Sequence, residues 1–405
     1  MKYQKIGKII AGLLAILIVF GRLSMGAEAS VKEQPPFEEF NLTIMAVGDN
    51  LMHMGVVNTG KQEDGSLDYS CLYDGIAPFM ANSDIKIINQ ETILGGNERG
   101  FSGFPQFNSP IEVGESQARV GFNVVLQASN HTADQGVSGM DYCTAFWKTH
   151  PEAHMIGLHD PSEENPYTVL DIKGVKVAVL NYTYGPNYEV VSKEVALRMN
   201  LLCNRNEKTG QMDYTTLNPQ VPEDIKRAKA EADIVVVCPH WGTEYQTSPS
   251  SYQRNFAQQM TDAGADVIIG THPHVVQPVE EIVSENGHRC LCYYSLGNYV
   301  STQKNRDSML EGLAFITFHV SKEGISIVPS QTGVIPLVCQ YRSGPTRIMY
   351  VYPLEDYTEE LAKQHGIIPS GGVSFHLSDM QNLSEKVFGT YVLPKDIALK
   401  VPRTS

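Results

Sequence analysis

The stretch "DVIIGTHPHVVQPVE", residues 266–280, joins a short apolar run to two histidines that are two positions apart. The run "DVIIG" is typical of a buried β-strand that begins at a polar residue and ends at a glycine. Two imidazoles at the end of one strand need partners or water, and they can point to one centre only if the backbone leaves the strand pleat. His272 and His274 are therefore candidate ligands of a metal ion.

Apolar strand-like runs alternate with helical patterns along most of the chain, and the pattern after about residue 290 is mainly β. This order predicts an α/β or α+β layered domain. The predicted strands include residues 42–49, 84–91, 122–131, 167–174, 175–185, 233–242 and 266–274, with a turn at Lys173 and Gly174 that joins 167–174 and 175–185 as a hairpin. The predicted helices include 111–121, 137–150, 222–232 and 250–264.

Polar side chains of a particular kind follow five of the predicted strands, at the place where open α/β sheets hold their sites. Carboxylates, amides and imidazoles together suit Mn, Fe or Zn better than Ca. So many candidate ligands favour two divalent ions that share a bridging carboxylate and activate a water molecule. These side chains are Asp49 and His53; Asn89 and Glu91; Asn130, His131 and Asp134; His240 and Glu244; and His272 and His274.

Each of these motifs also has a purely structural explanation. Asp49 could cap a turn, and His53 could be an ordinary helix histidine. Glu244 is either a surface acid or a carboxylate that orients an imidazole. Asn298 forms a turn or lines a pocket, and Glu280 belongs to a strand edge or contacts the site from behind a ligand. A shared site is the stronger hypothesis, because the structural explanation requires five coincidences at equivalent strand ends.

The N-terminus predicts export. Lys2, Lys5 and Lys8 precede the apolar stretch 9–21, and small residues follow at 27–29. This pattern predicts either a cleaved signal peptide over residues 1–29 or an uncleaved membrane anchor. A linker follows over residues 30–41. Both alternatives place the rest of the chain outside the cytoplasm, secreted or anchored to the outer face of the cytoplasmic membrane.

The net charge of the chain indicates which classes of binding partner are expected. The 405 residues carry a formal net charge of −14. Nucleic-acid-binding proteins normally present basic surface, so we expect no nucleic-acid partner. Neutral, cationic or metal-bridged substrates remain open.

Six segments, taken in their order along the chain, resemble a known family. That family is the CapA-type poly-γ-glutamate capsule biosynthesis family, which is itself similar to the calcineurin-like metallophosphatases. The resemblance covers residues 42–345, and residues 346–405 are expected to pack on that domain as an extension. It implies a four-layer αββα sandwich with its site at the strand ends. The segments are "MAVGDNLMH", "INQET", "ASNHTADQG", "PHWGTEY", "GTHPHVVQPVE" and "YSLGNYV".

The resemblance also implies roles for the candidate ligands of two divalent metal ions. Asp49, with His53 as a less closely matched companion, would bind the first metal, and Glu91 would stand at the bridging position. The sequence departs from the superfamily pattern twice: the first Asp and His are four residues apart, and the bridging residue is Glu rather than Asp. Asn130 and His240 would bind the second metal, and the remaining ligands, divided between the two metals, would be His272 and His274.

Two functions follow from this set of expectations. In the first, the protein is a metal-dependent hydrolase of a phosphoester or an amide, with His131 as general acid and Asp134 orienting it. In the second, it is a polymer-handling component of a capsule synthesis and export complex. There it would meet membrane-embedded partner proteins and bind poly-γ-glutamate or another cell-surface polymer without turnover. A purely structural exported domain is disfavoured by the polar groups at the strand ends.

Overall fold

The computed structural model describes residues 38–163, 166–342 and 348–401. The predicted signal peptide or anchor at residues 1–29 and most of the predicted linker lie outside the described residues. Strand β1 (Phe40–Asn50) begins two residues before the predicted start of the main domain. Within the described ranges, no helix combines the length and the apolar character that crossing a membrane requires.

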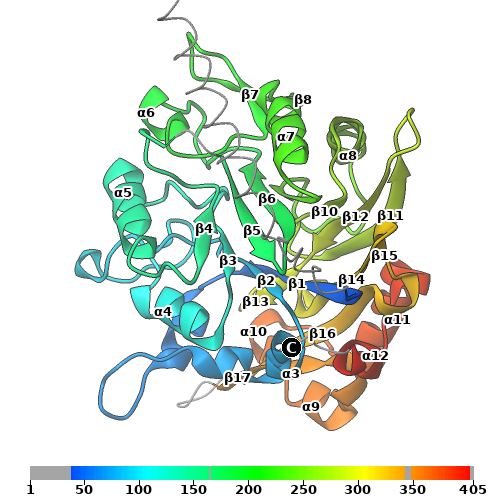
Figure 1. Ribbon diagram of the computed structural model, residues 1–405. Helices are drawn as coiled ribbons and strands as arrows, with labels where there is room; N and C mark the ends of the chain where they lie inside the picture. Colours follow the sequence, from blue (N-terminus) through cyan, green and yellow to red (C-terminus); the bar gives the residue numbers. More distant parts are fainter. Residues whose placement is uncertain (1–37, 164–165, 343–347, 402–405) are drawn as a thin grey trace, which may run out of the picture. The chain divides into compact units, whose positions relative to one another are not determined.

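The first sheet has the strand order β17-β16-β14-β1-β2-β3-β4, with β13 beside β1 and β15 beside β14. Strands β1 to β4 run parallel, so the residues that follow β1, β2 and β3 meet at one edge (Figure 1). The other strands of the sheet close it as antiparallel neighbours, apart from the short parallel β13. Their bounds are β2 (Ile85–Asn89), β3 (Val124–Leu126), β4 (His154–Ile156), β13 (Asn298–Val300), β14 (Leu310–Ser321), β15 (Gly324–Ile327), β16 (Gly333–Arg342) and β17 (Ile348–Pro353).

The second sheet has the order β11-β12-β10-β9-β6-β5. Its four inner strands are parallel, and hairpins add the antiparallel edges β5 and β11. The predicted hairpin turn at Lys173 and Gly174 is confirmed, and both residues have the positive φ, 55° and 87°, that a tight hairpin turn needs. The strands are β5 (Tyr167–Ile172), β6 (Val175–Thr183), β9 (Ile234–His240), β10 (Val267–Ile269), β11 (Val276–Val283) and β12 (Arg289–Leu296), and a separate ribbon pairs β7 (Cys203–Arg205) with β8 (Met212–Leu217).

The two sheets lie face to face between helices, which confirms the four-layer αββα arrangement. In Figure 1, α4 and α5 lie beyond β3 and β4, while α7 and α8 lie beyond the second sheet. The alternation along β9 shows the layering, because Val236 faces the core between the sheets whereas Val235 and Val237 pack under α7 and α8.

The helices were largely predicted from their apolar spacing. The main ones are α3 (Ala77–Ala81), α4 (Ile111–Val120), α5 (Gly136–Trp147), α7 (Gln220–Glu231), α8 (Ser251–Ala263) and α11 (Leu377–Phe388). Shorter helices are α2 (Met54–Val57), α6 (Lys193–Ala196), α9 (Glu359–Lys363), α10 (Ile367–Gly371) and α12 (Lys395–Lys400). Short 3₁₀ segments are η1 (Asn58–Gly60), η2 (Ser70–Ile76), η3 (Asn97–Arg99), η4 (Arg306–Met309), η5 (Pro329–Gln331), η6 (Leu354–Asp356) and η7 (Gly389–Tyr391).

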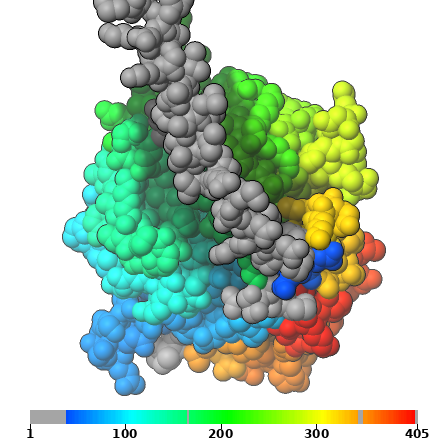
Figure 2. Space-filling view, in the orientation of Figure 1, coloured from blue at the N-terminus to red at the C-terminus, as the bar shows by residue number. Residues whose placement is uncertain are grey.

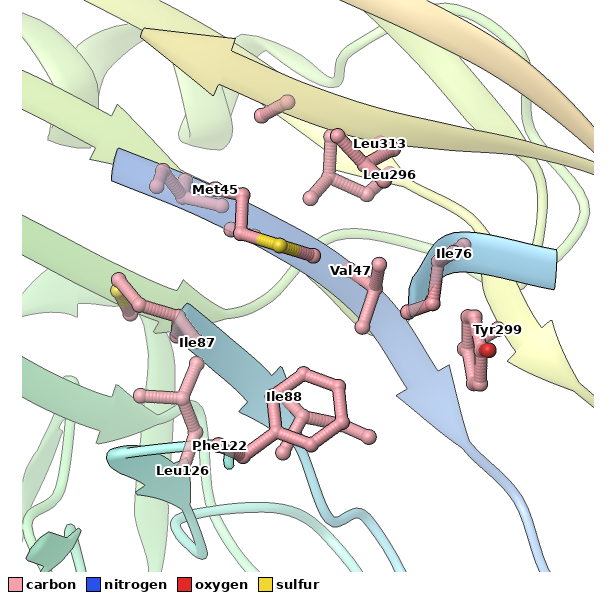
Figure 3. Packing of buried hydrophobic residues seen from close by; sticks show 14 of the residues in the cluster. Met45, Val47, Ile76, Ile87, Ile88, Phe122, Leu126, Leu296, Tyr299 and Leu313 are labelled. Carbon is pink, nitrogen blue, oxygen red and sulfur yellow. The ribbon is translucent and has the colours of Figure 1, made fainter. Parts of the chain in front are cut away.

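A dense apolar core holds the strands whose ends carry the candidate ligands. Figure 3 shows Met45 and Val47 of β1 in this core together with Ile87 of β2, Leu126 of β3 and Leu313 of β14. All five side chains are buried. Close packing of this kind resists small displacements, so the polar residues at the strand ends are held at fixed separations.

The described part of the C-terminal segment belongs to the same architecture. Strand β17 extends the first sheet beyond β16, and the Asn82 side chain donates to the Leu399 carbonyl at 2.7 Å. Figure 2 shows the orange and red residues of this segment on the same face as the blue residues that follow β1. The extension therefore completes an edge of the first sheet.

His365, which lies between α9 and α10, gives stability a pH dependence. The imidazole is buried, its Nε2 lies 2.8 Å from the Cys339 carbonyl, and its Nδ1 accepts from the Ile367 N–H. Burial lowers the pKa of His365 to about 4, against a smaller opposing effect of the Cys339 carbonyl. The unfolded chain therefore takes up this proton first as the pH falls, and stability is lost from about pH 6.5 downward.

We expect the wild type to lose about 2 kcal/mol more than His365→Gln between about pH 7 and about pH 5. Urea unfolding of metal-free protein at both pH values measures this difference. The substitution itself can lower stability at both pH values, so the slope with pH is the quantity compared. Equal slopes in the wild type and in His365→Gln would contradict the role of His365 in this pH dependence.

Candidate metal centre

The candidate ligands meet at the carboxyl ends of parallel strands from both sheets. β1, β2 and β3 of the first sheet and β9 and β10 of the second sheet each end at or just before one of these residues. Asp49, His131, His240, His272 and His274 are all buried. The predicted convergence of these strand ends on one place is therefore what the structure shows.

Glu91, His272 and His274 form the tightest group. Each offers one ligand atom, and these atoms lie within 4.8 Å of one another. Among the described residues, neither carboxylate oxygen of Glu91 has a hydrogen-bond partner, and neither does Nδ1 of His272. A buried carboxylate without donors is unfavourable unless a cation compensates its charge. The three side chains therefore fit a metal ion.

The backbone at the two histidines leaves the strand, as the spacing required. His272 and His274 have φ values of 97° and 58°, which non-glycine residues rarely adopt. Such strain costs about 1–3 kcal/mol per residue and is concentrated at functional sites. Just before these histidines, the backbone at Gly270 passes close to the Tyr294 carbonyl oxygen. Glycine is needed there, because a Cβ would lie 2.1 Å from that oxygen.

Asp49 lies at the edge of this group and holds His274. Its Oδ2 lies 3.0 Å from Nδ1 of His274, and its Oδ1 accepts from the Asn89 side chain at 2.7 Å. The His272 N–H donates to Oδ2 at 3.2 Å. Asn298 also contacts the His274 imidazole, because its Oδ1 lies 3.0 Å from Nδ1 of that ring. These contacts leave Nε2 of His274 directed at Glu91, 3.7 Å from Oε1.

His240 and Asn130 form the neighbouring part of the site. Nε2 of His240 lies 2.9 Å from Oδ1 of Asn130, and Nδ1 lies 3.0 Å from the Thr271 hydroxyl. The rings of His240 and His272 have centroids 4.8 Å apart. His240 and Asn130 therefore border the Glu91 group through the His272 ring.

His131 and Asp134 form an ion-pair geometry beside the cluster. Nδ1 of His131 lies 2.7 Å from Oδ2 of Asp134, and that oxygen also accepts from the Phe107 N–H at 2.7 Å. The Phe107 ring stands edge-on to the imidazole with centroids 4.6 Å apart. Asp134 therefore fixes the imidazole and leaves Nε2 as its remaining ring nitrogen.

Burial and neighbouring charges set the protonation of the cluster. Burial lowers the pKa of His240 and His272 well below the usual value, so both imidazoles are neutral and able to bind a metal. Burial also opposes the protonation of His274, but Glu91 and Asp49 outweigh it and raise its pKa to about 9. Burial raises the pKa of Glu91 well above the usual value, and His274 partly offsets this rise.

The structure places the other predicted residues at different distances from the cluster. His53 lies before α2, where its Nδ1 accepts from the Thr302 N–H at 3.4 Å, and it is outside the tight group. Burial, His274 and His131 lower its pKa to about 4. Glu244 lines a pocket beside His272. Glu280 is not brought to the site, since its carboxylate pairs with Arg254 Nη1 at 2.6 Å.

Asn89, one of the side chains singled out in the sequence, and two further residues contact these groups. Asn89 bonds Asp49 and lies 3.5 Å from His240, and Thr271 bonds His240. The Tyr184 ring lies 4.7 Å from the His272 ring, centroid to centroid. Thr271 belongs to the same strand-end motif as His272, so the motif carried the signal and only its extent was missed.

The four-layer sandwich with buried imidazoles and a buried carboxylate at its strand ends defines an α/β protein with a candidate metal site. The bacterial capsule synthesis protein family PGA_cap matches residues 43–303, and the chain belongs to this family.

Two curated relatives carry related names. The PGA biosynthesis protein CapA of Bacillus subtilis (strain 168) is 29% identical over 324 residues, which are 77% of each chain. The capsule biosynthesis protein CapA of Bacillus anthracis is 29% identical over 348 residues, 82% of this chain and 75% of the relative. A hypothetical protein from Thermus thermophilus, of known crystal structure, is 15% identical and covers 71% of this chain and 98% of its own, with a TM-score of 0.38.

Glu91→Gln tests the metal centre directly. Free Mn²⁺ or Zn²⁺ at about 100 times its Kd would stabilise the wild type by about 2.7 kcal/mol, and we expect Glu91→Gln to lose most of this gain because the neutral amide is a poor ligand. Thermal unfolding with and without metal measures this stabilisation in the wild type and in the variant. Glu311→Gln is the matched control, because Glu311 is another buried carboxylate without a hydrogen-bond partner among the described residues, outside the cluster. Equal losses in both variants would contradict the assignment.

Proposed function

We propose that this chain is a metal-dependent hydrolase of cell-surface polymer synthesis that cleaves a phosphoester or an amide. The main support is the buried carboxylate of Glu91, which faces two histidines and has no hydrogen-bond donor among the described residues. Backbone strain at His272 and His274 adds to this support, because strain of this kind is concentrated at functional sites.

The proposed cofactors are two divalent ions, of Mn, Fe or Zn. Glu91 with His272 and His274 would hold one ion, and Asn130 with His240 would hold the second beside Glu91. When bound, ions of this kind activate water and neutralise negative charge that develops on substrate oxygens. The protein's own part is to hold the imidazoles at fixed separations, with His240 and His272 kept neutral by burial that lowers the pKa of each, and to exclude bulk water from the buried cluster.

His131 is proposed as the general acid, a role that was predicted from the family resemblance. Asp134 binds Nδ1 at 2.7 Å, so the proton that reaches the leaving group would be carried on Nε2. Asp134 is itself held by the Phe107 N–H, which fixes the orientation of the imidazole. The same acid would serve a phosphoester oxygen or an amide nitrogen as leaving group.

The setting proposed for this chemistry is capsule biosynthesis outside the cytoplasm. The names of the two CapA relatives support a role in capsule synthesis, with poly-γ-glutamate or another cell-surface polymer as substrate or product. The basic and apolar N-terminal sequence supports export or anchoring at the outer face of the cytoplasmic membrane. Membrane-embedded synthesis and export proteins are the proposed partners.

One observation favours the alternative of a non-catalytic polymer-binding or export component. His240 and Asn130, two predicted ligands of the second metal, lie 2.9 Å apart and can satisfy each other without an ion. In this alternative the site, with one ion or none, binds polymer and does not turn it over. Metal stoichiometry and turnover together separate the two functions.

Elemental analysis of the purified protein, beside His272→Ala/His274→Ala, is the first experiment. We expect about two equivalents of Mn, Fe or Zn in the wild type and their loss in the variant, together with loss of hydrolysis of bis(p-nitrophenyl) phosphate or a γ-glutamyl anilide. His376→Ala is the control. The His376 side chain is half exposed and pairs with Glu359, and neither residue belongs to the candidate metal-ligand group. Absence of metal after reconstitution would exclude the hydrolase mechanism.

His131→Gln separates catalysis from metal binding. We expect metal content to be retained and kcat to fall by about 10²–10⁴, the usual contribution of a general acid. A substrate with a good leaving group, such as p-nitrophenolate, should be affected less than one with an alkyl leaving group, because it needs no proton. Equal losses for both substrates would contradict the role.

A further inference from the structure

A pocket of about 500 Å³ lies directly beside His272, between the β7–β8 ribbon and the start of α8. This volume lies in the range of pockets that bind small organic molecules. Figure 1 shows β8 and α8 on the same side of the second sheet. Because His272 belongs both to this pocket and to the metal cluster, a molecule in the pocket touches the candidate reaction centre.

The lining of the pocket changes from apolar at its base to polar at its rim. Leu202, Trp241 and Phe256 are buried, and Trp241 already donates its indole N–H to the Tyr294 carbonyl at 2.9 Å. Tyr214 and Tyr252, in contrast, are 46% and 48% exposed. The base therefore suits a hydrocarbon group, and the rim suits a polar group.

The charge at the rim has one sign. Among the described residues that line the pocket, Glu244 is the acidic one, and Lys and Arg are absent. A carboxylate in a pocket that three tyrosines also line attracts an ammonium group through its charge and through the negative faces of the rings. An anionic group at the same place would be repelled.

The start of α8 does not reverse this preference. Helix N-termini often bind anions through free N–H groups. Here a capping box occupies two of these donors, because the Ser250 side chain accepts from the Gln253 N–H at 3.2 Å and the Gln253 side chain accepts from the Ser250 N–H at 2.9 Å.

We propose that this pocket binds an aliphatic primary amine, with its hydrocarbon part against Leu202, Trp241 and Phe256 and its ammonium group at Glu244 between the tyrosines. The chain's substrate would then carry an amine-bearing side chain close to the bond that reacts. The inference about the substrate rests on the proposed hydrolase function, whereas the inference that the pocket binds an amine does not.

Titration calorimetry with hexylamine, hexanol and hexanoate tests the pocket, since these ligands share one hydrocarbon chain and differ in charge. The full-length wild type should bind hexylamine about three- to fivefold tighter than hexanol, as expected for one partly exposed charge pair, and hexanoate most weakly. Glu244→Gln should remove the difference between hexylamine and hexanol and leave hexanol binding unchanged. Glu63→Gln, on an exposed loop, is the matched control and should change nothing.

Equal binding of hexylamine and hexanol by the wild type, or tighter binding of hexanoate, would overturn the proposal. So would a Glu244→Gln variant that keeps the preference for the amine. The titrations are repeated with metal-free protein and with His272→Ala/His274→Ala. Retention of the amine preference there, together with no hydrolase activity in the metal-reconstituted wild type, would refute the proposed function and leave the amine site standing.

Discussion

The carboxylate of Glu91, buried against two imidazoles and without a hydrogen-bond donor among the described residues, is the constraint on which the rest of the site depends. Moving an ionised carboxylate out of water costs several kcal/mol unless an opposite charge accompanies it. The left-handed backbone at His272 and His274 is a second unfavourable feature at the same place. A bound cation offsets both, because it compensates the charge and uses the nitrogens that the strained backbone presents.

The site needs both sheets at once. Asp49 of the first sheet contacts His274 of the second, and Asn130 of the first contacts His240 of the second. Neither sheet alone brings together a carboxylate, an amide and several imidazoles. The apolar core between the sheets therefore determines the geometry of the site. It fixes the separation of strand ends whose residues lie up to 225 positions apart in sequence.

Short local patterns predicted an α/β or α+β layered domain and the convergence of the ligands, whereas the four-layer arrangement was implied by the family resemblance. Apolar runs followed by polar residues located the strand ends, and the Lys173–Gly174 turn located a hairpin. The placement of Glu280 could not be predicted, since it depends on which face of β11 meets α8 and its Arg254. The link from Asn89 to His240 spans 151 residues, and only the pairing of sheets reveals it.

The charge distribution divides the site into two parts that suit different portions of one substrate. The whole chain carries a net charge of −14, and Glu244 adds negative charge at the rim of the pocket beside His272. An anionic reacting group would therefore need cations held at Glu91 and its two histidines. A cationic or apolar portion would gain by lying away from those cations, in the pocket lined by Trp241. If both proposals hold, a polymer of like-charged carboxylates would contact the metal ligands alone, and a substrate with an amine near its reacting bond would use both parts.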